Sequence, residues 1–151
     1  MKITPICLMV LAALPLYAQE QKKTFAQKLV DESLAKHPDV VILAMHAKSP
    51  TDAEYPIIAS NIGRIGKKAD EDDMRVINTG KNNLEVNKTG NHFEVELPLQ
   101  DASKKTIGAL GVVFNYKAGD NKKAFEKKAT KLRDELRAQI PEAGKLFDKA
   151  P

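Results

Sequence analysis

The chain has 151 residues, the size of one ordinary domain, and its 24 Lys and Arg against 20 Asp and Glu give a formal net charge of +4. This mild excess is not the signature of a nucleic-acid-binding protein, in which basic residues cluster on one face, so we expect no nucleic-acid partner. The chain has one cysteine, which excludes an intramolecular disulfide framework.

The first eighteen residues have the pattern of a secretory signal peptide. Lys2 supplies a positive start, residues 6–14 form an apolar block, and Pro15 and Ala18 supply a helix breaker and a small residue at the cleavage point. The block is shorter than the about 20 residues that a bilayer-spanning helix needs. We therefore expect cleavage after Ala18 and a single periplasmic or secreted bacterial domain over residues 19–151. An uncleaved anchor is the alternative.

The next segment predicts a helix and two strands. Thr24 and Gln27 form a capping box, and the His-Pro pair at 37–38 ends the helix, because the residue before proline is pushed out of the α region. The β-branched run 40–45 predicts a buried strand, and residues 55–59 predict a second one.

The centre of the chain predicts a loop and a short helix. Residues 61–66 contain two glycines and form a hinged loop. Residues 70–78 predict a helix, because the acids at 70–73 oppose the positive end of the helix dipole and Gly80 is a C-cap.

Three strands in a meander follow. Residues 84–86 alternate with polar neighbours, and residues 93–99 alternate so regularly that one face of that strand is buried and the other is wet. Residues 106–114 are apolar on both faces and predict a central strand. In it Gly108 and Gly111 leave space for something packed closely.

The chain closes with a helix capped by Asp120 and ended by Pro141, with one apolar stripe and a lysine-rich solvated face. We interpret residues 141–151 as a loosely held tail.

The order of these elements predicts an α+β fold with a PAS-like five-stranded antiparallel sheet, long N- and C-terminal helices, and a short helix inserted between strands two and three.

Three segments carry a resemblance to a known family. Residues 57–66 resemble the second strand and following loop of bacterial extracellular Cache sensor domains, residues 106–114 are similar to their final strand, and residues 40–45 fit their first strand. The resemblance covers roughly residues 25–116. It implies a pocket between the sheet and the inserted helix, where the family holds carboxylates, amino acids or amines.

The chain departs from the family in two ways. Such domains usually sit between membrane helices and drive a kinase or chemotaxis domain, whereas we expect only a helix after this sheet, so the chain is expected to bind without signalling through itself. The aromatic-arginine-aspartate pattern of the amino-acid-binding members is missing, so the resemblance implies no particular ligand.

We expect the ligand between the final strand and the loop that runs from Asn61 to Arg75. Arg64 and Arg75 flank the insertion and are candidates for holding a small carboxylate. Surface salt bridges to the acids at 70–73 are the alternative for both arginines. The expected ligand-binding residues are Tyr55, Ser60, Arg64, Arg75 and Asn115.

No catalytic or metal motif stands out. His46 and His92 are candidate metal or haem ligands, but neither has a partner at ligand spacing, and a structural or solvated histidine is the stronger reading. The acids at 70–73 lack the spaced oxygens of a calcium loop. We therefore expect no enzyme, no cofactor and no metal, but an exported non-catalytic domain that binds a small carboxylate or other polar metabolite. The alternative is a protein–protein interaction module that acts with a membrane or exported partner or with a second copy of itself.

Overall fold

The structure, a computed structural model, describes residues 23–151, so the expected signal peptide lies outside the described residues. The elements are α1 (Phe25–Lys36), β1 (Val40–Ala47), β2 (Ile57–Ser60), α2 (Glu71–Thr79), β3 (Asn83–Val86), β4 (His92–Gln100), β5 (Thr106–Asn115), α3 (Lys122–Arg137) and the 3-10 helix η1 (Ala143–Phe147). This order confirms the predicted succession of elements. Among residues 23–151, no helix has both the length and the apolar character needed to cross a bilayer.

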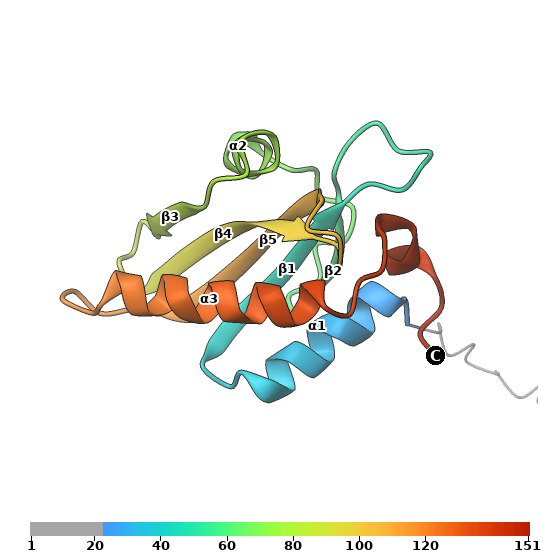
Figure 1. Ribbon diagram of the computed structural model, residues 1–151. Coiled ribbons are helices and arrows are strands. Elements are labelled where there is room, and N and C mark those ends of the chain that lie inside the picture. The colour runs from blue at the N-terminus through green and yellow to red at the C-terminus, as the bar shows by residue number, and fades with distance from the viewer. Residues whose placement is uncertain (1–22) are drawn as a thin grey trace, which may run out of the picture.

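The five strands form one antiparallel sheet in the order β2-β1-β5-β4-β3 (Figure 1). β5 lies at the centre, paired with β1 on one side and β4 on the other. Its apolar character on both faces follows from this place, because both faces of a central strand are covered. The predicted α+β class and five-stranded sheet are confirmed.

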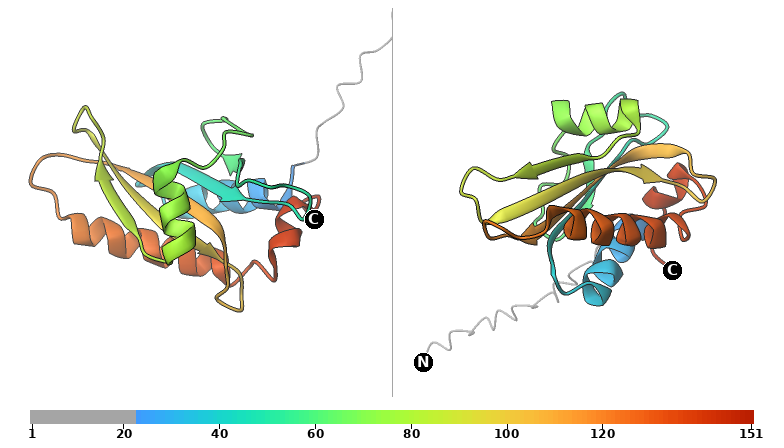
Figure 2. Two further views of the ribbon diagram at one scale, coloured as in Figure 1. Left: turned by 90° about the horizontal axis from the view of Figure 1, so that it is seen from above. Right: turned by 60° about the vertical axis from the view of Figure 1, so that its left-hand side comes forward.

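Helices cover the two faces of the sheet unequally. α1 and α3 lie across one face, and α2 alone lies over the other (Figure 2). Side chains at every second strand position face α1 and α3 and form the main core. In β4 these are Phe93, Val95 and Leu97, each at most 1% exposed, so the predicted buried face of this strand is confirmed.

α2 is held at both ends by its own sequence. Asp70 accepts hydrogen bonds from the backbone N–H groups of Asp72 and Asp73, and the Asp73 side chain accepts one from the Asp70 N–H, which completes a capping box. Gly80 ends the helix in the left-handed region at φ 68°. The acids at 70–73 are thus a helix start, as the sequence predicts.

The expectation of a wet second face on β4 is wrong for Glu96. This residue is only 8% exposed, because α2 packs over that face of the sheet. Alternation correctly predicts that Glu96 points away from the core, but it carries no information about what covers the side chain on the other face.

The two glycines of β5 serve different purposes. A Cβ on Gly108 would lie 1.8 Å from the carbonyl oxygen of His46, so its expected free space is filled by the β1 backbone, which is irregular between Met45 and His46. Gly111 instead faces α2, where a Cβ would approach Oε1 of Glu94 at 3.1 Å.

The C-terminal segment differs from its expectation. The N-cap of α3 is Asn121, whereas Asp120 accepts a hydrogen bond from the Lys117 N–H. The interpretation of residues 141–151 as a loosely held tail is at odds with their packing. Leu146 of η1 is fully buried, and the segment pairs with the start of α1 through an antiparallel bridge.

Candidate functional site

A partly enclosed cavity of about 170 Å³ lies between α2, the loop before it and the sheet. Its lining comes from β1, β2, the β2–α2 loop, α2, β4 and β5, and it mixes apolar with charged side chains. The lining residues are Ile42, Ala44, His46, Ile57, Ile62, Arg64, Lys67, Asp70, Asp73, Glu94, Glu96, Gly111 and Val113.

The cavity exists because small residues meet in the middle of the sheet. Gly111 of β5 is paired with Ala44 of β1 on one side and with Glu96 of β4 on the other. Glycine has no side chain and alanine only a methyl group. Space between the sheet and α2 therefore remains unfilled at this point.

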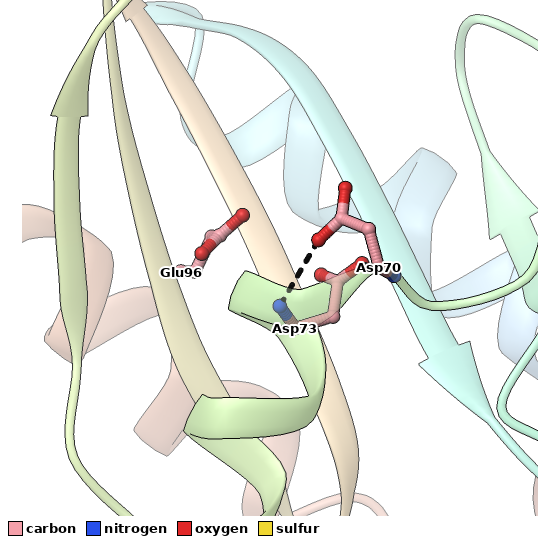
Figure 3. Close-up of side chains that lie close together, drawn as sticks. All are labelled: Asp70, Asp73 and Glu96. Atoms are coloured by element: carbon pink, nitrogen blue, oxygen red, sulfur yellow. Dashed lines mark hydrogen bonds between the residues drawn. The ribbon is translucent and has the colours of Figure 1, made fainter.

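Carboxylates from two directions converge in this space. Asp70 and Asp73 come from the start of α2, and Glu96 rises from β4 toward them (Figure 3). One oxygen from each lies within 4.8 Å of the others. Glu94, two residues before Glu96 on β4, is a fourth acid in the lining.

Burial and mutual repulsion perturb these acids. Loss of hydration, reinforced by Glu94 and Asp73, raises the pKa of Glu96 to about 7, although Asn83 donates a hydrogen bond of 2.9 Å to its Oε2. Burial also raises the pKa of Glu94 and of Asp73. The pKa of Asp70 is instead lowered, because its carboxylate accepts backbone hydrogen bonds at the start of α2 and lies near Lys67. Glu96 therefore keeps a proton near neutral pH more readily than an isolated carboxyl would.

His46 of β1 contacts the same group of acids through Asp73. Its Nδ1 lies 3.0 Å from the Tyr55 carbonyl oxygen, which can only accept, so Nδ1 carries the hydrogen. Nε2 then faces Oδ2 of Asp73 at 3.5 Å.

The loop before α2 brings the only fixed positive charges of the lining. Lys67 Nζ lies 3.8 Å from Oδ2 of Asp70. Arg64 has φ 62°, a left-handed backbone conformation that costs a residue other than glycine about 1–3 kcal/mol. This strained position carries Arg64 to the edge of the cavity.

The donor set is of the kind that holds cations. Asp70, Asp73 and Glu96 offer hard carboxylate oxygens that suit a metal ion or an ammonium group. His92, the other histidine considered as a ligand, begins β4 away from this group and lies 3.4 Å from Nδ2 of Asn87.

Of the five residues expected to bind ligand, Arg64 alone belongs to the lining of this cavity. Ser60 is buried in β2, where its hydroxyl accepts a hydrogen bond from the Ile62 N–H. Tyr55 lines a different hollow beside Lys48, and only its carbonyl reaches this site, through His46.

The other two expected residues lie elsewhere. Arg75 is on the exposed side of α2, where it pairs with Asp72. This is the surface salt bridge that the sequence offers as the alternative, so Arg64 and Arg75 do not form a clamp. Asn115 is exposed at the far end of β5, beside an open hollow that it shares with Tyr116 and Lys117.

Sequence reasoning missed the buried acids. The alternation through residues 93–99 predicts that Glu94 and Glu96 face solvent, and burial of Glu96 contradicts this. The interpretation of His46 as structural agrees with its burial and its contact with the Tyr55 carbonyl.

The sequence does contain a signal for the burial of Glu96. The core must lie on the face of the sheet that carries Phe93 and Val95. The inserted helix therefore has to cover the opposite face, which carries Glu94, Glu96 and Gly111.

Comparisons with known proteins establish the fold. No protein-family model and no curated protein matches the sequence. Among solved structures, the GAF domain of A. aeolicus nlh2 in an inactive state has a TM-score of 0.58 at 14% identity, over 76% of this chain and 83% of that one. The Agrobacterium tumefaciens repressor BlcR has a TM-score of 0.56 at 7% identity, over 78% and 67%.

A third similar structure contains a ligand. The inducer-binding domain of the PobR transcription factor from Acinetobacter, a double mutant in complex with 3-hydroxybenzoic acid, has a TM-score of 0.51 at 10% identity, over 76% of this chain and 97% of that one. At such identities the likeness shows architecture alone. The chain has a GAF-like α+β fold.

Proposed function

We propose that this chain is an exported, non-catalytic domain that binds a small polar metabolite in the cavity between α2 and the sheet. The observation that carries the proposal is the cavity itself: charged side chains surround a space of about 170 Å³ at a place where a purely structural domain would pack apolar groups. The similarity of three segments to Cache domains and the ligand in the PobR domain support this choice.

The same cavity weighs against the alternative of an interaction module. A sheet that served only for pairing with another protein would need no hollow under α2 and no buried carboxylates there. Burying the carboxyl groups of Glu96 and Asp73 costs free energy. Buried acids of this kind are found mainly at functional sites.

A ligand-library thermal-shift screen tests the proposal. A ligand present at 100 times its dissociation constant adds about 2.7 kcal/mol to the free energy of unfolding. The decisive variant is Ala44→Leu, which places a larger side chain in the cavity, and the matched control is Ala138→Leu on the exposed end of α3. Hits should disappear in Ala44→Leu and persist in Ala138→Leu; hits that survive both changes would place the site elsewhere.

Export is tested separately. Mass spectrometry of the exported fraction of the native host should find a chain that begins near Gln19. An intact chain beginning at Met1 and confined to the cytosol would contradict this part of the proposal.

A further inference from the structure

We infer that the group recognised in the cavity is a cation, and that the ligand is a small aliphatic ammonium compound rather than a carboxylate. This inference rests on the proposed function and specifies its ligand class. Arg64 and Arg75 suggest a negatively charged ligand in the sequence, whereas the inferred ligand is positively charged. Three observations support the inference.

The first is the balance of charge inside the cavity. Four carboxylates line it, from Asp70, Asp73, Glu94 and Glu96. The fixed cations of the lining are Arg64 and Lys67, and Lys67 is already directed at Asp70. A carboxylate ligand would add a fifth acid to this group, whereas an ammonium ligand would relieve the repulsion among the four.

The second is the hydrogen-bonding capacity left in the two most buried acids. Glu96 and Asp73 are 8% and 6% exposed. Asn83 donates to Oε2 of Glu96 and the Asp70 N–H donates to Oδ2 of Asp73. Within residues 23–151, no hydrogen bond reaches Oε1 of Glu96 or Oδ1 of Asp73, although both side chains line the cavity. Both oxygens can therefore accept from a group that enters the cavity, and an ammonium group has three donors and no acceptor.

The third is the size and the apolar part of the cavity. A volume of about 170 Å³ is several times that of one water, about 30 Å³, and so exceeds what a bare metal ion fills. Ile42, Ile57 and Val113 line the same space. A short alkyl chain can lie against these side chains while its ammonium group faces Glu96 and Asp73.

The test uses probes that differ only in the head group. Two- to five-carbon primary alkylamines are compared with the carboxylic acids and alcohols of the same carbon skeleton, by calorimetry on residues 19–151 at slightly alkaline pH and low salt. At least one amine should bind 10-fold or more tightly than its matched acid and alcohol. Glu96→Gln, which keeps the shape of the side chain, should weaken that amine by 10-fold or more.

Glu85→Gln is the matched control, because Glu85 lies exposed on the adjacent strand β3 and outside the cavity lining. Its amine affinity should equal that of the parent. A parallel arm with calcium chloride alone distinguishes an organic cation from a metal ion. Calcium binding that depends on Glu96, in the absence of amine binding, would overturn the inference in favour of a metal site.

Failure of the inference and failure of the proposed function give different results. Acids that bind more tightly than amines, and lose affinity in Ala44→Leu, would overturn the cation while the cavity remained the site. Absence of amine binding at any soluble concentration also overturns the inference. Library hits that are indifferent to Ala44→Leu would instead overturn the proposed function.

Discussion

The two faces of the sheet are built from the same strands but have opposite character. Under α1 and α3, β4 presents Phe93, Val95 and Leu97, all fully or almost fully buried among other apolar side chains. Under α2, the same strand presents Glu94 and Glu96 to a cavity. The first face stabilises the domain by burying apolar surface, whereas the second retains desolvated charge that stabilises nothing by itself. In β4, neighbouring residues thus alternate between the apolar core and the charged cavity.

The largest effect should come from the apolar face. Phe93 is 1% exposed and packs against the rings of Tyr116 and Phe125, so Phe93→Ala should lower the free energy of unfolding by about 3–5 kcal/mol. A denaturant titration followed by circular dichroism measures this. Leu84→Ala, at a position 42% exposed, should change it by about 0.5 kcal/mol or less. Equal costs at the two positions would contradict the assignment of the core face.

On the cavity face, the ionised Glu96 side chain is expected to lower the free energy of unfolding, whereas Phe93 raises it. The pKa of Glu96 rises from 4.5 to about 7 on folding, so between these values the unfolded chain releases a proton that the native chain keeps. The free energy of unfolding therefore falls as the pH rises from about 4.5 through about 7. With about 1.4 kcal/mol for each pKa unit, the loss through this group is at most about 3.5 kcal/mol above pH 7.

Glu96→Gln removes this titration and should stabilise the domain at pH 8 while leaving it nearly unchanged at pH 4. Denaturant titrations of the parent and the variant at both pH values measure the difference. If Glu96→Gln destabilised the domain at pH 8, the carboxylate would be a net stabilising group, and the contrast between the two faces would fail.

A smaller effect tests how α2 is held over the cavity. Gly80 ends α2 at φ 68°, so Gly80→Ala should lower the free energy of unfolding by about 1 kcal/mol. Gly144→Ala is the comparison, because Gly144 has no positive φ and open space around its Cβ position. A cost no larger than that of Gly144→Ala would show that the C-cap contributes little to fixing α2.

The smallest effect is expected at the exposed ion pair of α2. Arg75→Ala removes the contact with Asp72, and exposed pairs of this kind contribute about 0.2–1 kcal/mol. Because Arg75 lies outside the cavity lining, affinity for any cavity ligand should stay at the parent value. A large loss of affinity in a calorimetric titration would restore Arg75 to the site and weaken the assignment of the cavity.

Local signals were enough to predict most of the fold. Thr24 as an N-cap, Gly80 as a C-cap and the alternation through residues 93–99 act over a few neighbouring residues, and the structure has each of them in its predicted role. The Asp120 cap was wrong by one residue, because Asn121 offers the same kind of side chain to the first turn of α3.

The candidate site was harder to predict from the sequence, because it is formed by contacts between segments that are distant along the chain. Glu96 becomes a buried acid only when α2 lies over it. His46 lines the same cavity only because β1 pairs with β5 and β5 pairs with β4. Arg64 and Arg75 were equivalent in the sequence. They differ in the structure because one lies in the loop at the edge of the cavity and the other on the outer side of a helix.

The pairing of the chain ends has a practical consequence. Thr24 and Lys149 form an antiparallel bridge, and the Ala150 N–H donates to the Lys23 carbonyl, so residues 23 and 150 lie side by side, away from α2 (Figure 1). A donor and an acceptor dye attached at residues 23 and 150 would stay close together in the native domain and separate when it unfolds. Energy transfer between them would report folding without any label near the cavity, and a surface linked through either end would leave the cavity facing solution.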